Sequence, residues 1–237
     1  QEVSGPAGPS AGVRPPRTEA TATKKMQTVS ISFYRFDGPL PKVWALVQMA
    51  FTAGRLAHVP DIGFFKVFGT GSRESFHPVQ NFGVYAILAT WPSLAVAKRR
   101  VAEGVVFEDY RRHAAESWTV YLSTVKAWGA WDGRAPFEVA EAPATPVPVG
   151  VLTRATLRKR HLAAFWKRVP AISDATVRQD TLMFKLGMGE IPLLHQVTFS
   201  VWGDFQSMVR FAYRSGAHKE AVRQVREHGW FKEQLFA

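Results

Sequence analysis

The feature that most constrains the fold of this chain is a pattern that occurs twice. The segment FKVFGTG at 65–71 resembles FKLGMG at 184–189. Two tryptophan pairs recur at nearly constant separations of 111 and 112 positions: Trp91 with Trp202, and Trp118 with Trp230. Agreement in both local sequence and spacing indicates an internal duplication, so each half is expected to fold as one copy of the same unit.

Each half also carries the same order of elements, as judged from apolar periodicity. In the first half, strands are expected at 28–36, 63–68, 83–91 and 118–128, and helices at 42–57, 92–102 and 105–116. In the second half, strands are expected at 151–158, 181–187, 193–202 and from 230 onward, and helices at 159–169, 205–213 and 217–227. The shared order, β-α-β-β-α-β, is that of a ferredoxin-like unit.

The expected fold is therefore α+β, with two ferredoxin-like units in one chain. They bury their sheet faces on each other as a closed barrel of the dimeric α+β type, with helices outside. The units are expected at 26–130 and 151–237, with a proline-rich linker at 131–150. Residues 1–25 lack an apolar signal-peptide core and are expected to form a disordered tail or an extension.

Composition narrows the classes of function. The absence of cysteine excludes thiolate ligands, cysteine nucleophiles and iron–sulfur clusters in this chain. The net charge of +11 is spread over the expected helices without a nucleic-acid-binding motif, so nucleic acid is not an expected partner. An anionic membrane surface suits the same charge. The 17 Phe and 8 Trp residues indicate either an aromatic-rich core or a pocket for a large apolar ligand.

One histidine interrupts an apolar helical face. His218 shares its face with Ala221, Val222 and Val225, at spacings of three, four and seven residues. A buried imidazole needs a partner, which is either a core hydrogen-bond acceptor or a metal or haem iron. The matching residue in the first half is Val106, so the duplicated architecture does not require this histidine. That difference favours a chemical role.

A haem site needs an axial ligand, an apolar slot and cations for the propionates. Candidates for all three occur in the second half: His218 as metal ligand; Phe184, Phe199, Trp202 and Phe211 as the slot; Arg214 and Arg223 as the cations. His195 lies in an apolar strand that is expected to line the barrel. It is either a hydrogen-bonded core residue or a catalytic base.

Four longer strings are more specific than these patterns, and they lie at 60–71, 81–103, 114–137 and 195–237. They closely resemble the spheroidene monooxygenase family, the acyclic carotenoid 2-ketolases of photosynthetic bacteria, and the resemblance extends from Met26 to Ala237. The family continues beyond this point, so the last strand is expected to be truncated.

The resemblance implies a haem-dependent monooxygenase that introduces a keto group at C-2 of an acyclic carotenoid such as spheroidene. It implies O2 as co-substrate, a reduced ferredoxin as electron donor, and a cytoplasmic location peripheral to the inner or photosynthetic membrane. Two alternatives stay open. One is a cofactor-free oxygenase or other enzyme on the same barrel, with His195 or His218 as base. The other is a non-catalytic protein that binds haem or a hydrophobic ligand.

Overall fold

The computed structural model describes residues 26–71, 80–166, 181–191, 193–214 and 229–237, with the backbone alone at 80 and 212–214. The described strands are β1 (Thr28–Arg35), β2 (Phe65–Gly71), β3 (Gln80–Trp91), β4 (Glu116–Leu122), β5 (Trp128–Gly129), β6 (Val149–Leu157), β7 (Leu182–Gly189), β8 (His195–Trp202) and β9 (Phe231–Phe236). They form one antiparallel sheet in the order β4-β1-β3-β2-β7-β8-β6-β9-β5.

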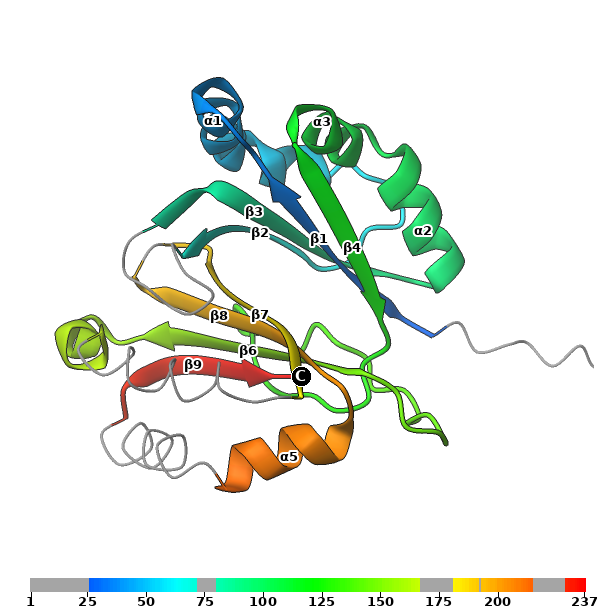
Figure 1. Ribbon diagram of the computed structural model, residues 1–237, viewed down its shortest axis with the longest axis vertical. Coiled ribbons are helices and arrows are strands. Elements are labelled where there is room, and N and C mark those ends of the chain that lie inside the picture. The colour runs from blue at the N-terminus through cyan, green and yellow to red at the C-terminus, as the bar shows by residue number, and fades with distance from the viewer. Residues whose placement is uncertain (1–25, 72–79, 167–180, 192, 215–228) are drawn as a thin grey trace, which may run out of the picture.

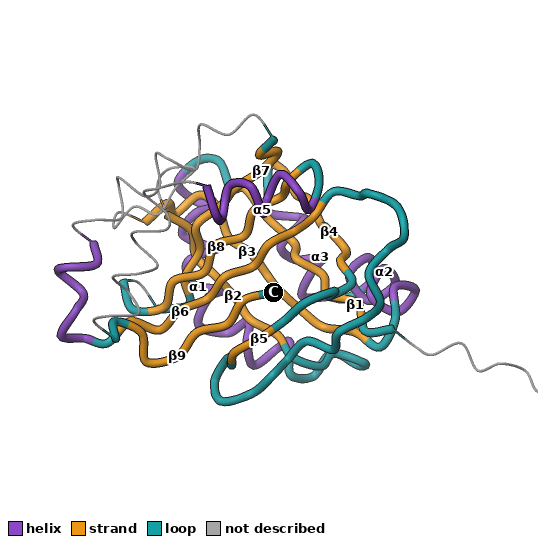
Figure 2. Tube along the Cα trace, turned by 90° about the horizontal axis from the view of Figure 1, so that it is seen from below, coloured by secondary structure: helices purple, strands orange, loops and turns teal. Residues whose placement is uncertain are grey.

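The described helices are α1 (Pro39–Leu56), α2 (Leu94–Glu103), α3 (Val105–His113), the short 3-10 helix η1 (Lys159–His161) and α5 (Phe205–Arg214). The first three cover the outer face of one half of the sheet, and α5 covers the outer face of the other half (Figure 1). Viewed from below, α5 lies in front of the sheet and α1 to α3 lie behind it (Figure 2). None of the described helices has the length and hydropathy needed to cross a bilayer.

The sheet consists of two halves that lie face to face. The order β4-β1-β3-β2 in the first half corresponds, position by position, to β9-β6-β8-β7 in the second. The halves join through β2 and β7, at the pairs Gly69↔Gly189 and Thr70↔Met188. Within the described residues the end strands β4 and β5 are not paired with each other. In the part of the chain that the structure describes, the sheet folds on itself and stays open between β4 and β5, where the expected barrel would close.

Strand alternation divides the core into layers. The interior layer between the two halves contains Val29, Ile31, Phe33, Phe68, Ala86, Leu88, Trp131, Phe137, Leu152, Met188, Val197, Phe199 and Leu235. The layer beneath α1 to α3 contains Tyr34, Phe36, Ala45, Leu56, Tyr85, Ile87, Ala89, Trp91, Ala97, Val101, Val106, Phe107 and Tyr110. Strand β3 contributes to both layers and has a neighbour on each side. The prediction of a central strand at 83–91 is confirmed.

Two expectations for the middle of the chain need correction. The strand expected at 118–128 ends at Leu122, and Trp128 belongs to β5, which pairs with β9. The segment expected to be a linker contributes Trp131, which is fully buried, and Phe137 to the interior layer. Burying the large apolar area of these rings stabilises the fold, even though the residues around them show no apolar periodicity. The helix expected at 217–227 lies outside the described residues.

Candidate functional site

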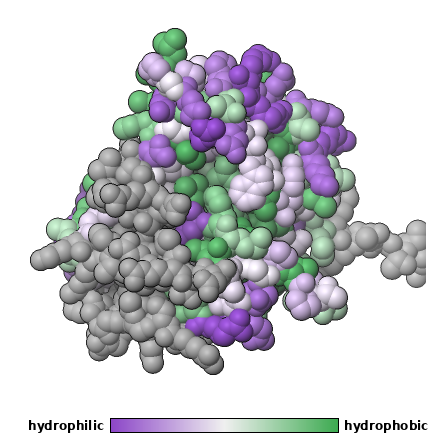
Figure 3. Space-filling model, in the orientation of Figure 1, coloured by the Kyte–Doolittle hydropathy of each residue, from purple (hydrophilic) through white to green (hydrophobic). Residues whose placement is uncertain are grey.

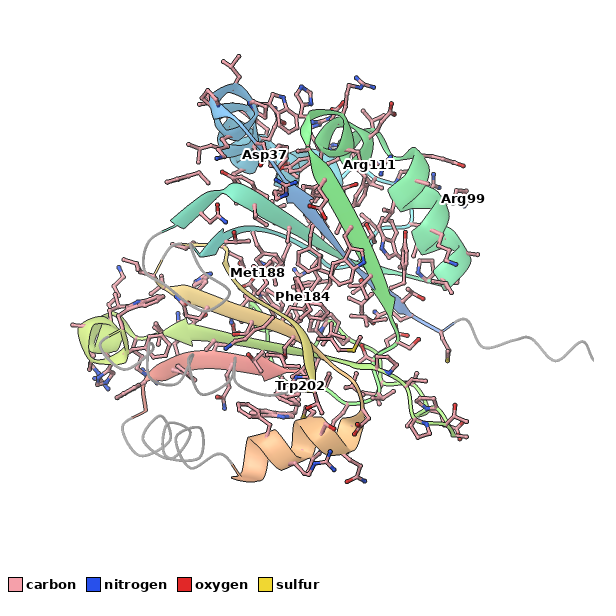
Figure 4. The ribbon with its side chains drawn as sticks, in the orientation of Figure 1. Asp37, Arg99, Arg111, Phe184, Met188 and Trp202 are labelled. Carbon is pink, nitrogen blue, oxygen red and sulfur yellow. The ribbon has the colours of Figure 1, made fainter. Side chains whose placement is uncertain are left out.

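An interior aromatic cluster lies between the two halves of the sheet. Phe33 of β1 contacts Trp118 of β4, Phe184 of β7 and Phe199 of β8, with ring centroids 5.3, 5.4 and 5.9 Å away. Phe184 lies 5.1 Å from Trp118 and 6.2 Å from Phe199, measured between centroids. Figure 4 places Phe184 between the two halves. Trp118 is 43% exposed, so the cluster reaches the surface at strand β4.

A second group of side chains, the interior charged cluster, surrounds the ring of Trp131. Its members are Lys66, Asp132, Arg154, Glu190, His195 and Glu233. Lys66 forms ion pairs with Asp132 and Glu190, the latter at 3.0 Å between Nζ and Oε2. Arg154 forms an ion pair with Glu233, and its Nη2 lies 3.4 Å from Oδ1 of Asp132. Both cations also lie near the face of the Trp131 ring, at 5.9 and 5.5 Å from its centroid.

His195 enters this cluster from the first residue of β8. Its Nδ1 lies 3.5 Å from Oε2 of Glu190, yet this buried nitrogen has no hydrogen-bond partner within the described part of the chain. Glu190 already accepts hydrogen bonds from Trp131 Nε1 at 2.6 Å and from Lys66 Nζ at 3.0 Å. An unsatisfied imidazole nitrogen next to a carboxylate can accept or release a proton.

The cations control the ionisation of two carboxylates in the cluster. Burial alone raises the pKa of Asp132, but the hydrogen bond from Lys66 and the charges of Lys66 and Arg154 hold it below its ordinary value. For Glu233, burial also raises the pKa. The backbone N–H groups of Gly133 and Asp132, together with Arg154, outweigh that effect and hold the pKa below its ordinary value. Both carboxylates are therefore ionised at neutral pH and fix the positions of the cations.

The structure separates the four aromatic residues expected to form a haem slot. Phe184 and Phe199 face the interior, whereas Trp202 and Phe211 stack on each other, 5.1 Å between centroids, on the outer face beneath α5. Phe199 and Trp202 are three residues apart in one strand, and successive side chains of a strand alternate between its faces. His218 and Arg223 lie outside the described residues, and only the backbone of Arg214 is described.

The interior does not fit a haem in this conformation. The rings of the interior aromatic cluster contact one another at centroid distances of 5.1 to 6.2 Å, which leaves no slot for a macrocycle between them. No group of three His, Cys, Asp or Glu side chains that could bind a metal ion occurs in the described part of the chain. Val151, Trp202 and Phe211 form a buried cluster beneath α5, which is the last described helix before His218 in the sequence.

The expectation that the two FK motifs occupy equivalent positions also needs correction. Phe65 packs in the outer layer beneath the helices, whereas Phe184 faces the interior. The two motifs are thus out of phase by one residue, and in a strand such a shift exchanges the faces of every side chain. Consequently Lys66 lies in the interior charged cluster, because its neighbours on the same face are Phe64 and Phe68.

Sequence reasoning found His195 in this cluster and missed the other charged members. One signal was available, since Arg154 is the single charged residue in the apolar strand β6 and is buried to within 2% exposure. Asp132 lies between the halves and Glu190 follows the end of β7, so no local pattern marks them, whereas Glu233 lies within β9 on the face of Phe231 and Leu235.

Comparisons with known proteins add the family context. No family model matches the chain. The chain is 42% identical over 213 residues to the spheroidene monooxygenase of Cereibacter sphaeroides, an alignment that covers 90% of this chain and 66% of that protein. It is 42% identical over 215 residues to the spheroidene monooxygenase of Rhodobacter capsulatus, which covers 90% of this chain and 89% of that protein. This chain therefore spans slightly less than two thirds of the first relative.

Among solved structures, an aldoxime dehydratase has a similar fold. Its TM-score is 0.57 at 10% sequence identity, and the match covers 90% of this chain and 81% of that chain. At this identity the similarity concerns the fold alone.

Proposed function

The chain belongs to the spheroidene monooxygenase family, and we propose that it is a carotenoid monooxygenase that introduces a keto group at C-2 of an acyclic carotenoid such as spheroidene. The observation that carries this proposal is the 42% identity over 89% of the Rhodobacter capsulatus protein. Two ferredoxin-like units produced by duplication account for the matching strand orders of the two halves and are part of the proposal.

The interior aromatic cluster is the proposed contact surface for the polyene. Flat rings and a conjugated chain bury apolar area on one another efficiently. Trp118 provides the point at which the cluster reaches solvent. The interior charged cluster lies on the same face of β8, where the polar end of the substrate would find cations and carboxylates. In this arrangement Phe184 and Phe199 contact substrate rather than a cofactor.

A methylene group of a hydrocarbon chain is too weakly acidic for a histidine to remove its proton, so this reaction needs an oxidising cofactor. Haem bound to the protein would supply activation of O2, with electrons from a ferredoxin. His218 is the proposed haem ligand, with Arg214 and Arg223 at the propionates. Trp202 and Phe211 stack on each other at 5.1 Å and are buried, so they would form a wall beside the haem rather than a slot around it. Val106, the residue matched to His218, is 4% exposed in the layer beneath α3, which supports an inward-facing His218.

A second candidate is a cofactor-free oxygenase on the same scaffold. It is favoured by one observation: the buried Nδ1 of His195 lies 3.5 Å from Glu190 and has no hydrogen-bond partner among the described residues. Such an enzyme would act on a substrate that carries an acidic proton, with His195 as base and the cations of the cluster balancing the developing charge.

The absorption spectrum and the turnover of the purified protein distinguish these candidates. We expect a Soret band that shifts with dithionite, and conversion of spheroidene to its ketone with O2 and reduced ferredoxin. His218→Ala should lose the band and the activity. The matched control is His58→Ala, because His58 is exposed just beyond α1 and its ring bonds the Gly54 carbonyl at 2.9 Å. A colourless protein whose turnover disappears in His195→Gln would support the second candidate and contradict the first.

The substrate surface has a separate test. Phe184→Leu should raise KM for the carotenoid several-fold while the Soret band stays unchanged, since Phe184 faces away from the Trp202 layer. Phe205→Leu is the control, because Phe205 is 47% exposed on α5. If Phe184→Leu alters the Soret band and leaves KM unchanged, the assignment of the interior to substrate is wrong.

A further inference from the structure

Helix α1 exposes a continuous apolar face. Leu40, Val43, Val47 and Phe51 recur at three- and four-residue spacing and are 81, 58, 50 and 60% exposed. Leu46, at 49% exposure, lies beside them. We call these five residues the α1 stripe. By the helical rise it extends for about 16 Å. Figure 3 shows hydrophobic side chains projecting at the end of the molecule where Figure 1 places α1.

The α1 stripe is not needed for the fold. The opposite side of α1 already packs on the sheet through Ala45, Thr52 and Leu56, all fully buried. A surface helix ordinarily carries polar residues on its outer face. An apolar strip of this kind on a soluble surface marks a site of interaction with a membrane or another protein.

Charge around the stripe favours an anionic partner. Helix α1 contains Lys42 and Arg55 and has no acidic residue. The depression of about 550 Å³ beyond its C-terminal end adds no net positive charge, because Glu103 lies in its lining and its two arginines pair with Asp109 and Asp61. The whole chain carries a net charge of +11. An apolar strip on a helix that carries no acidic residue, in a chain of strong positive charge, is complementary to a bilayer with anionic headgroups.

The start of α1 lies at the same end of β1 as the exposed edge of the interior aromatic cluster. Strand β1 leads into α1, and at that end Arg35 pairs with Glu116, two residues before Trp118. At the same end the Phe36 N–H donates to the Gly83 carbonyl at 2.7 Å. Gly83 follows Phe82, which is 48% exposed. The exposed rings of Phe82 and Trp118 thus lie near the start of α1.

We propose that the α1 stripe, together with Phe82 and Trp118, docks the protein on an anionic lipid bilayer. The choice of a bilayer rather than a second copy of the chain rests on the proposed function, because an acyclic carotenoid dissolves in the hydrocarbon layer. Docking in this orientation places the exposed edge of the interior aromatic cluster at the lipid surface, so that the substrate need not cross water.

Flotation with vesicles of phosphatidylcholine and phosphatidylglycerol tests the proposal without using catalysis. We expect the purified full chain to float with these vesicles. Val47→Glu combined with Phe51→Glu should weaken vesicle binding by about tenfold or more, because each change removes apolar contact and adds repulsion. Both side chains are exposed, so folding should be retained, as circular dichroism would show. Val139→Glu is the control, since Val139 is 60% exposed outside this surface.

Each outcome bears on the proposal separately from the proposed function. Vesicle binding that is lost in the double variant supports it even if no carotenoid is converted. Failure of the wild type to float, or equal flotation of the double variant, overturns it. A wild-type dimer that becomes monomeric in the double variant also overturns it, since a second copy would then cover the stripe; light scattering measures this.

Discussion

Arg154 illustrates how one residue can hold several segments together. Its side chain is 1% exposed and pairs with Glu233 of β9 and Asp132 of the segment between the halves. Removing one partner of a buried ion pair leaves the other charge without compensation. We expect Arg154→Met to lower the free energy of unfolding by about 3 kcal/mol, measured by urea denaturation.

The matched control for that measurement is Arg112→Met. Arg112 pairs with Glu108 at 2.7 Å, but the two side chains are 64 and 52% exposed. An exposed pair contributes little to stability, so this change should stay within about 0.5 kcal/mol of the wild type. Equal losses in the two variants would contradict a special role for the buried arginine.

The residue scale also shows where sequence reasoning stops. The inward position of His195 follows from its apolar strand and was predicted. Its environment was not, because the partners converge from distant parts of the sequence. Asp132, for example, donates its backbone N–H to Glu233, 101 positions away. Pairings over such distances depend on tertiary register, which no local pattern encodes.

Among the elements, α5 has a strong N-terminal cap. Asp204 Oδ1 accepts from the Ser207 backbone N–H and Oδ2 accepts from the Ser207 hydroxyl, both at 2.7 Å. We expect Asp204→Ala to lower Tm by a few degrees, because the helix loses both bonds. Ser93→Ala is the comparison at the start of α2, where the bond to Val96 is 3.4 Å long. It should shift Tm less in the same thermal scan.

The junction of strands β2 and β7 gives an element-scale prediction with a built-in control. Gly69 and Gly189 face each other there. A Cβ at Gly189 would lie 2.7 Å from the His195 carbonyl oxygen, whereas one at Gly69 would meet nothing within 4 Å. We expect Gly189→Ala to reduce the free energy of unfolding by about 1 to 3 kcal/mol. Gly69→Ala should stay within about 1 kcal/mol of the wild type in the same urea titration.

Element prediction succeeded where one pattern dominated a segment. The apolar run at 83–91 became β3, and the helices at 42–57 and 105–116 became α1 and α3 with modest changes of boundary. The match between Trp91 and Trp202 in the two repeats also has a structural counterpart. Each indole donates to a serine hydroxyl, Ser30 at 2.8 Å and Ser200 at 3.0 Å. The FK motifs misled, because a one-residue phase difference in a strand is invisible to local similarity.

At the scale of the whole molecule, the interior charged cluster links all three parts of the chain. Lys66 comes from the first half, Asp132 from the segment between the halves, and Arg154 and Glu233 from the second half. Within the described residues, the halves also pair through two residue pairs of β2 with β7 and two of β5 with β9. The sequence predicted halves packed face to face, and it could not predict that the ion pair of Lys66 with Glu190 joins them.

This arrangement makes the stability of the whole molecule dependent on pH in a definite direction. The pKa values of Asp132 and Glu233 are lower in the folded protein than in the unfolded chain. A group with a lowered pKa stabilises the fold above its unfolded value, about 4 for these carboxyls, and that contribution disappears as pH falls through the folded value. We therefore expect the free energy of unfolding to fall steeply below about pH 4.

Urea denaturation at a series of pH values between neutrality and acid would measure this dependence. In Arg154→Met the cation that lowers both pKa values is absent, so the decline below about pH 4 should be shallower than in the wild type. Arg112→Met should retain the wild-type slope, because its pair lies at the surface. Parallel curves for wild type and Arg154→Met would mean that other carboxylates control acid unfolding. In that case the ion pairs between the halves contribute packing and orientation rather than pH-dependent stability.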